Sequence, residues 1–431
     1  METLQENHND YSHRSQKLAI LSACFGSPAP IMIQDSAIII LFAGMLGAGS
    51  MLSLVTTALF GIMSCIFLIP FAYFVSRLGY KKSIIRTTGV GTVMVILLAL
   101  TPFLGETFAK YGMIACLICF GAAMTFYAAA WFPFVDEFLP ENDRSRFFGM
   151  LRFSWQTCCV VFFFVCGLII GEKPDLWLLQ TIIVITAVLL LGRAYFVNRI
   201  KVRETDRKPL NFRYGLELVL ANKPLVSFSV YLAFLYLAAQ RTMPLTYVYL
   251  KNYLNIPDNI VVIISSLALG GTIIGFLCAG RMLSRYGVKK MLLAVHIAFA
   301  LVNFLLFVFC RPGAFFLVVI TFLLILYGFF IAISSVAASS EMMALANPNN
   351  KAMAMAFCVS MYSAGLGGAR LLSSVVIGSG ILSPEWTIGT AKFSMFHSMF
   401  LGYGLGILFV CFLLVIVPAI FPKGEYHYVP Q

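Results

Sequence analysis

Three charged residues lie deep inside apolar stretches of the sequence: Asp35, Arg241 and Arg370. A charge at the centre of a membrane-spanning helix costs about 2.5–3.5 kcal/mol on insertion scales. Such residues therefore usually bind a substrate or ion, pair with another charge, or transfer a proton. A guanidinium binds a carboxylate or phosphate through two parallel hydrogen bonds, and a carboxylate can load and release a proton. One carboxylate and two guanidinium groups have a net charge of +1, which favours an anionic substrate.

The elements that position these residues must be membrane-spanning helices. Of the 431 residues, 60% are hydrophobic and only 11% are charged, whereas soluble domains carry about 25% charged residues. The apolar runs are continuous and about 20 residues long, as helices require, and do not alternate as the strands of a barrel would. We predict an all-α membrane protein with twelve transmembrane helices in two pseudo-symmetric six-helix bundles. The expected spans are 18–45, 51–75, 83–104, 109–134, 147–171, 176–198, 226–250, 259–283, 290–310, 314–338, 353–378 and 395–421.

The net charge of +12 arises from Lys and Arg clusters beside the apolar runs. The positive-inside rule places such clusters in the cytoplasm, so lipid rather than nucleic acid is the expected partner. Because the number of spans is even, both termini are expected to be cytoplasmic. The long polar connector is either a solvated linker or an amphipathic helix on the membrane surface. The predicted segments are a tail 1–17, a first bundle 18–198, a linker 199–225, a second bundle 226–421 and a tail 422–431.

An internal repeat relates the two predicted bundles. Ser-Arg-Leu-Gly-Tyr-Lys-Lys at 76–82 recurs as Ser-Arg-Tyr-Gly-Val-Lys-Lys at 284–290, and the two glycines are 287 − 79 = 208 residues apart. Pro140 and Pro348 repeat this offset, since 348 − 140 = 208. A glycine at the turn permits the positive φ that a tight reversal needs. The repeat therefore predicts two similar halves, each with a short basic turn between its second and third helices.

This arrangement resembles the major facilitator superfamily over nearly the whole chain. The loop pattern of that family is Gly-x-x-x-Asp-Arg-x-Gly-Arg-Arg, and this chain departs from it at Ala72, Ser76 and Ser284, where the family has Gly, Asp and Asp. The resemblance implies that the aspartate helps to latch the cytoplasmic side, and a serine supplies no charge for that contact. Alternatively, the basic turns only fix topology and contact lipid headgroups. The expected latch residues, including acidic substitutes, are Ser76, Arg77, Gly79, Lys81, Lys82, Asp136, Glu137, Arg146, Ser284, Arg285, Gly287, Lys289, Lys290 and Glu341; Gly280 matches the first glycine of the second copy.

The resemblance also implies that spans 1 and 7 face one another across a central cavity. Position 35 plus the offset of 208 is 243, two residues from Arg241, so Asp35 and Arg241 are expected near one substrate site, with Arg370 entering from span 11. Asp35 is the candidate for proton coupling, because burial and a neighbouring arginine act in opposite directions on the proton affinity of a carboxylate. Alternatively, Asp35 and one arginine form a structural tie, and the aromatic residues only pack. The expected substrate-binding residues are Asp35, Arg241, Arg370, Gln34, Gln240, Tyr127, Trp131, Arg152 and Gln156.

Two glycine-containing segments are expected to bend or pack closely. Gly26, Pro28 and Pro30 interrupt span 1, where proline frees carbonyls and kinks a helix. The glycines at 365–368 in span 11 favour close helix packing over a hinge. Arg193, near the end of span 6, is expected to anchor the helix by extending its charge to the membrane surface.

The sequence favours a transporter over an enzyme. It has no Walker loop and no cluster of metal ligands, so no cofactor is expected, and Cys116 and Cys119 are interpreted as small apolar residues. The expected function is secondary active transport of a small organic anion or an acidic sugar, by a monomer in a bacterial inner membrane. The span 160–171 lacks the glycine-rich signature of many exporters in the family, which favours uptake. The alternatives are a neutral sugar or nucleoside carrier, a drug or lipid carrier, and a sensor that does not transport.

Overall fold

The computed structural model describes residues 2–139, 144–202, 212–311, 313, 315–346, 350–389, 391–417 and 420, and these residues are mostly helical. The helices before the linker are α1 (Glu2–Gly26), α2 (Pro28–Gln34), α3 (Ile38–Met45), α4 (Ser50–Leu78), α5 (Tyr80–Leu100), the 3₁₀ turn η1 (Thr101–Leu104), α6 (Glu106–Asp136), α7 (Arg144–Ile170) and α8 (Leu176–Arg199). The later elements are α9 (Phe212–Ala221), α10 (Lys223–Ala239), α11 (Thr242–Val248), the π-helical turn η3 (Tyr249–Tyr253), α12 (Asp258–Tyr286), α13 (Val288–Phe309), α14 (Phe316–Leu345), α15 (Lys351–Ser379), β1 (Glu385–Ile388), β2 (Ala391–Ser394) and α16 (Met395–Ile416).

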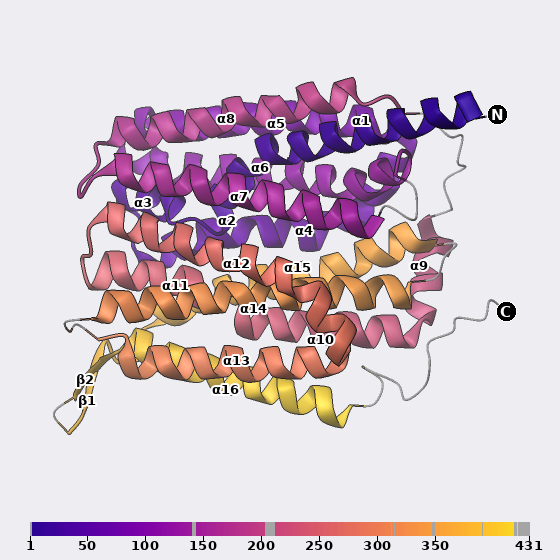
Figure 1. Cartoon of the computed structure of the whole chain (residues 1–431). Coiled ribbons are helices and arrows are strands. Elements are labelled where there is room, and N and C mark those ends of the chain that lie inside the picture. Colours follow the sequence, from indigo (N-terminus) through magenta and orange to yellow (C-terminus); the bar gives the residue numbers. More distant parts are fainter. Residues whose placement is uncertain are drawn as a thin grey trace.

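Figure 1 shows the helices lying side by side, with α1 to α8 (the first half) on one side and α10 to α16 (the second half) on the other. Helix α4 packs along α15 and α7 packs along α12, and these two pairs join the halves. Gly79 and Gly287 end α4 and α12 with φ of 84° and 78°, so the positive φ predicted for the two basic turns is confirmed. We call the end of the molecule that carries these turns the basic end, and the opposite end, where β1 and β2 lie, the hairpin end.

The hairpin at the hairpin end corrects the prediction of an all-α protein. Strands β1 and β2 pair antiparallel with Glu385 opposite Ser394. The rings of Trp386 and Phe393 stack across the strands at 4.6 Å, and Phe393 stacks on Phe307 of α13 at 5.1 Å. A connector this short carries little hydropathy signal, so the sequence pattern did not predict it.

Ten helices among the described residues are long and apolar enough to cross a membrane, and α2 with α3 adds an eleventh if that bent pair is one span. The 29-residue α15 is not among them. Its segment contains Arg370, several serines and several glycines, which lower its hydropathy although it packs between other helices.

Spans 1 and 7, predicted over 18–45 and 226–250, are both broken, and the sequence predicts an interruption only in span 1. Helix α1 ends at Gly26 and α2 begins at Pro28, so the predicted interruption is confirmed. A second, unpredicted break separates α2 from α3, whose axes differ by 63°. In span 7, α10 ends at Ala239 and α11 begins at Thr242. The repeat offset of 208 relates these two breaks within a few residues, so each half contains one helix that is interrupted at a similar depth.

Other boundaries also differ from the prediction. Helix α1 begins at Glu2, inside the segment predicted as a polar tail, and α16 ends at Ile416 rather than at residue 421. Helix α9 lies in the predicted linker 199–225. The sequence allowed either a solvated loop or an amphipathic helix there, and the structure has a helix over this part of the linker. Pro140 and Pro348, the second pair of repeat landmarks, lie outside the described residues.

Helices α4 and α15 approach each other through glycine. A Cβ placed on Gly61 would lie 2.7 Å from the backbone nitrogen of Gly367, and a Cβ on Gly367 would lie 2.7 Å from that of Ile62. On either side of this point, the Ser360 hydroxyl donates to the Cys65 carbonyl at 2.6 Å, and the Ser374 hydroxyl donates to the Met51 carbonyl at 2.8 Å. The packing role expected for the span 11 glycines is confirmed at Gly367. This α4–α15 contact runs from the hairpin end to about the middle of the molecule.

Candidate functional site

Arg370 of α15 joins the second half to the broken helix of the first. Its Nη2 donates to Asp35 Oδ1 at 3.0 Å, and its Nη1 donates to the carbonyls of Gln34 and Thr57, both at 2.8 Å. Gln34 is the last residue of α2, and a helix end leaves carbonyls that need donors and carries a partial negative charge. The Arg370 side chain is 1% exposed, whereas that of Asp35 is 33% exposed. The guanidinium therefore holds both a carboxylate and the end of α2 from across the interface between the halves.

Arg241 lies at the break of span 7 and makes different contacts. Its guanidinium carbon lies 4.2 Å from the centre of the Tyr403 ring on α16. The Tyr403 hydroxyl is hydrogen-bonded to Ser373 at 2.7 Å, and the Tyr327 hydroxyl donates to the Ala239 carbonyl at 2.5 Å, which satisfies the end of α10. The ion pair of Asp35 is thus with Arg370, and Arg241 packs within the second half.

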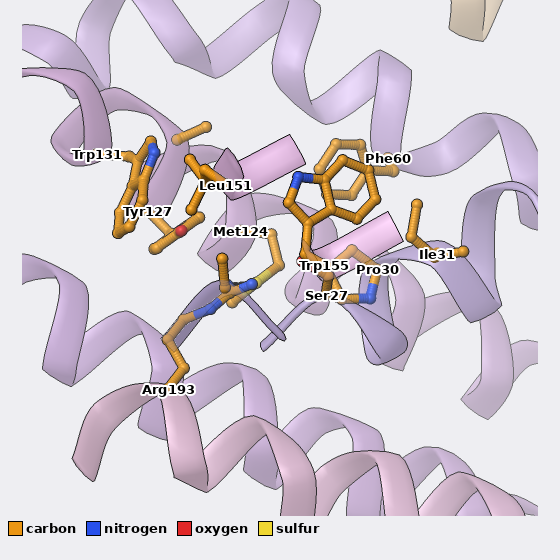
Figure 2. A pocket seen from close by; sticks show the side chains of 12 residues that line it. Ser27, Pro30, Ile31, Phe60, Met124, Tyr127, Trp131, Leu151, Trp155 and Arg193 are labelled. Carbon is orange, nitrogen blue, oxygen red and sulfur yellow. Dashed lines mark hydrogen bonds between the residues drawn. The ribbon is translucent and has the colours of Figure 1, made fainter. Parts of the chain in front are cut away.

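A pocket of about 220 Å³ opens among the helices of the first half. Figure 2 shows the rings of Tyr127 and Trp131 toward one side of it and those of Trp155 and Phe60 toward the other, with Arg193 reaching in from another helix. Tyr127 and Trp131 are predicted site residues, and both line the pocket. The full lining is Ala23, Ser27, Pro30, Ile31, Phe60, Met124, Tyr127, Ala128, Trp131, Leu151, Trp155 and Arg193.

Arg193 is the residue whose role the sequence interpretation missed. It is 3% exposed within the protein, so it is not the surface anchor that the sequence suggested. Its guanidinium carbon lies 4.0 Å from the centre of the Tyr127 ring, and its Nη1 donates to the Met124 sulfur at 3.6 Å. Its Nε has no hydrogen-bond partner within the described part of the chain.

Gly26 makes the room that Arg193 occupies. A Cβ on Gly26 would lie 1.8 Å from Arg193 Nε. We therefore expect Gly26→Ala to displace the guanidinium and to destabilise the protein by about 1–3 kcal/mol, as overpacking does. Thermal unfolding of the purified protein measures this. Gly44→Ala is the matched control, because a Cβ there meets nothing within 4 Å, and equal melting temperatures for the two variants would contradict the expectation.

The sequence profile of the Major Facilitator Superfamily matches residues 19–369. The chain belongs to the major facilitator superfamily. Membership makes it a multi-pass membrane protein with a transporter fold, and points to a transporter rather than an enzyme. No curated protein sequence matches the chain.

Solved structures of the superfamily share the fold. A crystal structure of the nucleoside transporter NupG has a TM-score of 0.71 and 17% identity, covering 96% of this chain and 100% of that one. A POT family transporter in complex with 5-aminolevulinic acid has a TM-score of 0.70 and 12% identity, covering 95% and 96%. A bacterial homologue of the iron transporter ferroportin, in an inward-facing state, has a TM-score of 0.63 and 10% identity, covering 94% and 98%. At these identities the likeness concerns the fold alone.

Two more of the residues predicted to bind substrate, Arg152 and Gln156, form hydrogen bonds across the interface between the halves. Arg152 of α7 donates through Nη2 to the Ser339 hydroxyl of α14 at 3.4 Å, and Gln156 donates to the Leu269 carbonyl of α12 at 3.3 Å. Gln240 caps the end of α10, and its backbone N–H donates to the Tyr236 carbonyl. The predicted set is therefore divided among four places: the Asp35–Arg370 pair with Gln34, the break of span 7 with Gln240 and Arg241, the pocket of the first half, and the α7 contacts with the second half.

The basic turns of this superfamily member make local contacts. The Ser76 hydroxyl donates to the Tyr73 carbonyl at 2.7 Å, one turn earlier in its own helix, and Ser284 does the same to Arg281 at 3.0 Å. Lys81 donates to the carbonyls of Asn198 and Ile200 at 2.7 and 2.8 Å, which satisfies the end of α8. These contacts support a structural role for the first turn.

The remaining latch residues stay a prediction. Glu341 is buried, and its Oε1 has no hydrogen-bond partner among the described residues, while the side chain of Arg146 lies outside them. In the described part of the chain, no three His, Cys, Asp or Glu residues come close enough to hold a metal ion.

Proposed function

We propose that the chain is a secondary active transporter that moves a small organic anion, or an acidic sugar, across the membrane by alternating access. The observation that carries this proposal is the Asp35–Arg370 ion pair. It joins the two halves at a helix break, where 3.0 Å separates Arg370 Nη2 from Asp35 Oδ1. In alternating access the halves rock about a central site and meet first at one end, then at the other. A charged contact between the halves would form and break in each cycle.

The proposed architecture has twelve spans in two six-helix bundles, 18–198 and 226–421. The ten apolar helices, the bent first span and the 29-residue α15 support this number. The basic end would face the cytoplasm under the positive-inside rule. The segments 1–17, 199–225 and 422–431 would then be cytoplasmic, and the membrane would be a bacterial inner membrane. The α4–α15 contact near the hairpin end supports an arrangement that is closed on the outer side. A monomer would suffice for this mechanism.

Arginines without an acidic partner support an anionic substrate. Arg152, Arg193 and Arg241 form no ion pair among the described residues, and each is surrounded mainly by aromatic rings or weak donors and acceptors. An unpaired cation in a low-dielectric environment is stabilised by an incoming anion. Because Arg370 pairs with Asp35, the uncompensated positive charge expected from the sequence would lie on Arg241, and Arg152 and Arg193 would add two more.

We further propose that Asp35 couples transport to protons as a symporter, because its carboxylate is one-third exposed while it is held by Arg370. The test uses the purified protein in liposomes that contain a pH-sensitive dye, with external glucuronate, succinate and benzenesulfonate as impermeant anions. We expect at least one anion to acidify the lumen of wild-type vesicles. We expect Asp35→Asn to abolish this proton movement and to flatten the pH dependence of uptake.

Asp258→Asn is the matched control for that experiment. Asp258 also forms an ion pair, with Lys251, but it is buried and lies at the start of α12 near the hairpin end. Proton movement that survives in Asp35→Asn would refute the coupling role. If the wild-type protein moves none of the anions or protons, the organic-anion proposal fails.

A nucleoside carrier is the second candidate. The aromatic rings around the pocket could stack on a base, and one of the similar solved structures is a nucleoside transporter. Uptake of uridine that no anion of the panel inhibits would favour this candidate.

A further inference from the structure

We propose that the pocket of the first half binds its substrate as a single planar ring bearing one anionic group. The anion would lie on Arg193, and the ring between Trp155 and Tyr127. This inference rests on the proposed transport function and narrows its substrate class. It also excludes the acidic sugars that the sequence left open.

The charge of the pocket supports an anionic ligand. Arg193 is the one charged residue among the twelve that line it, and no acidic residue lines it. Arg193 is 3% exposed, and its Nε has no hydrogen-bond partner in the described chain. Its guanidinium contacts the Met124 sulfur and the face of the Tyr127 ring. A buried charge without a counter-ion is unfavourable. A bound carboxylate or a similar anion would supply the missing partner through charge-assisted hydrogen bonds.

The walls and the volume of the pocket support a single planar ring. In Figure 2 the rings of Tyr127 and Trp131 and the ring of Trp155 lie toward opposite sides of the space, with Arg193 reaching toward it. Aromatic faces stack favourably on a planar ring. The volume of about 220 Å³ is below the range of about 300–1,000 Å³ typical of drug-sized ligands, which favours one ring over two.

The scarcity of hydrogen-bonding groups in the pocket disfavours a sugar. Apart from Arg193 and the aromatic residues, Ser27 is the one lining residue with a polar side chain, and its side chain makes no capping hydrogen bond to α2. A sugar presents several hydroxyl groups, each of which needs a partner when it leaves water. This lining cannot satisfy them, whereas it suits a ring with one polar group.

The test measures equilibrium binding by calorimetry, with the purified full chain in detergent and no gradient. The probes are benzoate, its neutral isostere benzamide, the non-planar cyclohexanecarboxylate, and glucuronate. We expect benzoate to bind most tightly of the four. We expect Arg193→Gln to weaken benzoate binding about 10- to 100-fold, the range for hydrogen bonds to charged groups.

Arg311→Gln is the matched control for the charge. Arg311 also lies over a ring, with its guanidinium carbon 3.9 Å from the centre of Phe393, and its Nε is also buried without a partner in the described chain. It does not line the pocket, so its loss is expected to leave benzoate binding within twofold of the wild type. Arg193→Lys is expected to recover part of the affinity, because it restores the charge without the planar fork.

Trp155→Leu, compared with the exposed Trp177→Leu, tests the ring independently if Arg193→Gln does not fold. We expect about tenfold weaker benzoate binding for Trp155→Leu and no change for Trp177→Leu. Equal affinity for benzoate and benzamide, unchanged benzoate binding in Arg193→Gln or in Trp155→Leu, or tighter binding of glucuronate would each overturn the inference.

Failure of this inference can be distinguished from failure of the proposed function. A protein that transports glucuronate in liposomes but does not bind benzoate would refute the ring-anion site and leave the transport proposal in place. A protein that binds benzoate through Arg193 but moves no anion of the panel would support the site and refute transport.

Discussion

Replacement of Arg370 by glutamine is expected to lower the free energy of unfolding by about 3 kcal/mol and to abolish transport. The substitution leaves three acceptors without their charged donor: the carboxylate of Asp35 and the carbonyls of Gln34 and Thr57. Because Arg370 is almost fully buried, water cannot replace it at the two carbonyls. Asp35 is partly exposed, which keeps the cost near the lower end of the range for a broken buried ion pair.

The measurement is thermal and denaturant unfolding of the purified protein, combined with transport assays in liposomes. A double-mutant cycle with Asp35→Asn isolates the pair, since the loss of Arg370 should cost less once the carboxylate is gone. If Arg370→Gln is as stable as the wild type, or if the two substitutions are additive, the ion pair does not stabilise this arrangement.

Replacement of Gly61 by leucine is expected to part the two halves at the hairpin end. Any side chain at this position meets the backbone of α15, because even a Cβ would lie 2.7 Å from the nitrogen of Gly367. Overpacking of this kind costs about 1–3 kcal/mol, which corresponds to a change of about 5- to 150-fold in the population of the closed arrangement. Transport is expected to fall accordingly, because each cycle must close this end.

Spin labels report the opening directly. Phe103 and Ile381 are exposed, one in each half, at or near the hairpin end, and they can be labelled in a background without the eleven native cysteines. The distance between the labels is expected to lengthen in Gly61→Leu and in Gly367→Leu. Gly402→Leu is the control, because a Cβ there meets nothing within 4 Å. A distance distribution that does not change in the first two variants would show that the close approach is not required for closure.

The sequence predicts the fold better than it predicts the helix breaks. Hydropathy and the offset of 208 residues indicate the spans, the two related halves and the basic turns, because these depend on composition and local spacing. The break at Asp35 to Ala37 leaves no such signal, since apolar residues flank it on both sides. It depends instead on Arg370, which is distant in sequence and satisfies the carbonyl of Gln34 at the end of α2.

The candidate site shows the same limit. Asp35 and Arg370 stand out as charges in apolar segments, but their spacing cannot show which arginine pairs with the acid. The repeat favoured Arg241 by position, whereas side-chain direction turns Arg241 toward Tyr403. Arg193 was interpreted as an anchor because it is near the end of a span, and only the packing of Gly26 against it shows that it is buried.

The α4–α15 contact has a consequence for the entropy of the transport cycle. Where the halves meet, Gly61 faces Gly367, and the neighbouring hydrogen bonds come from the short side chains of Ser360 and Ser374. Glycine has no rotamers to lose and serine has few, whereas long side chains lose up to about 2 kcal/mol each when they are immobilised. The glycine and serine contacts therefore order almost no side-chain freedom when this end closes, and the rotamer cost of this set of contacts falls chiefly on Arg370, which reaches the Thr57 carbonyl of α4. The two arrangements can then remain close in free energy, so that the binding of a small solute or a single proton is enough to decide between them.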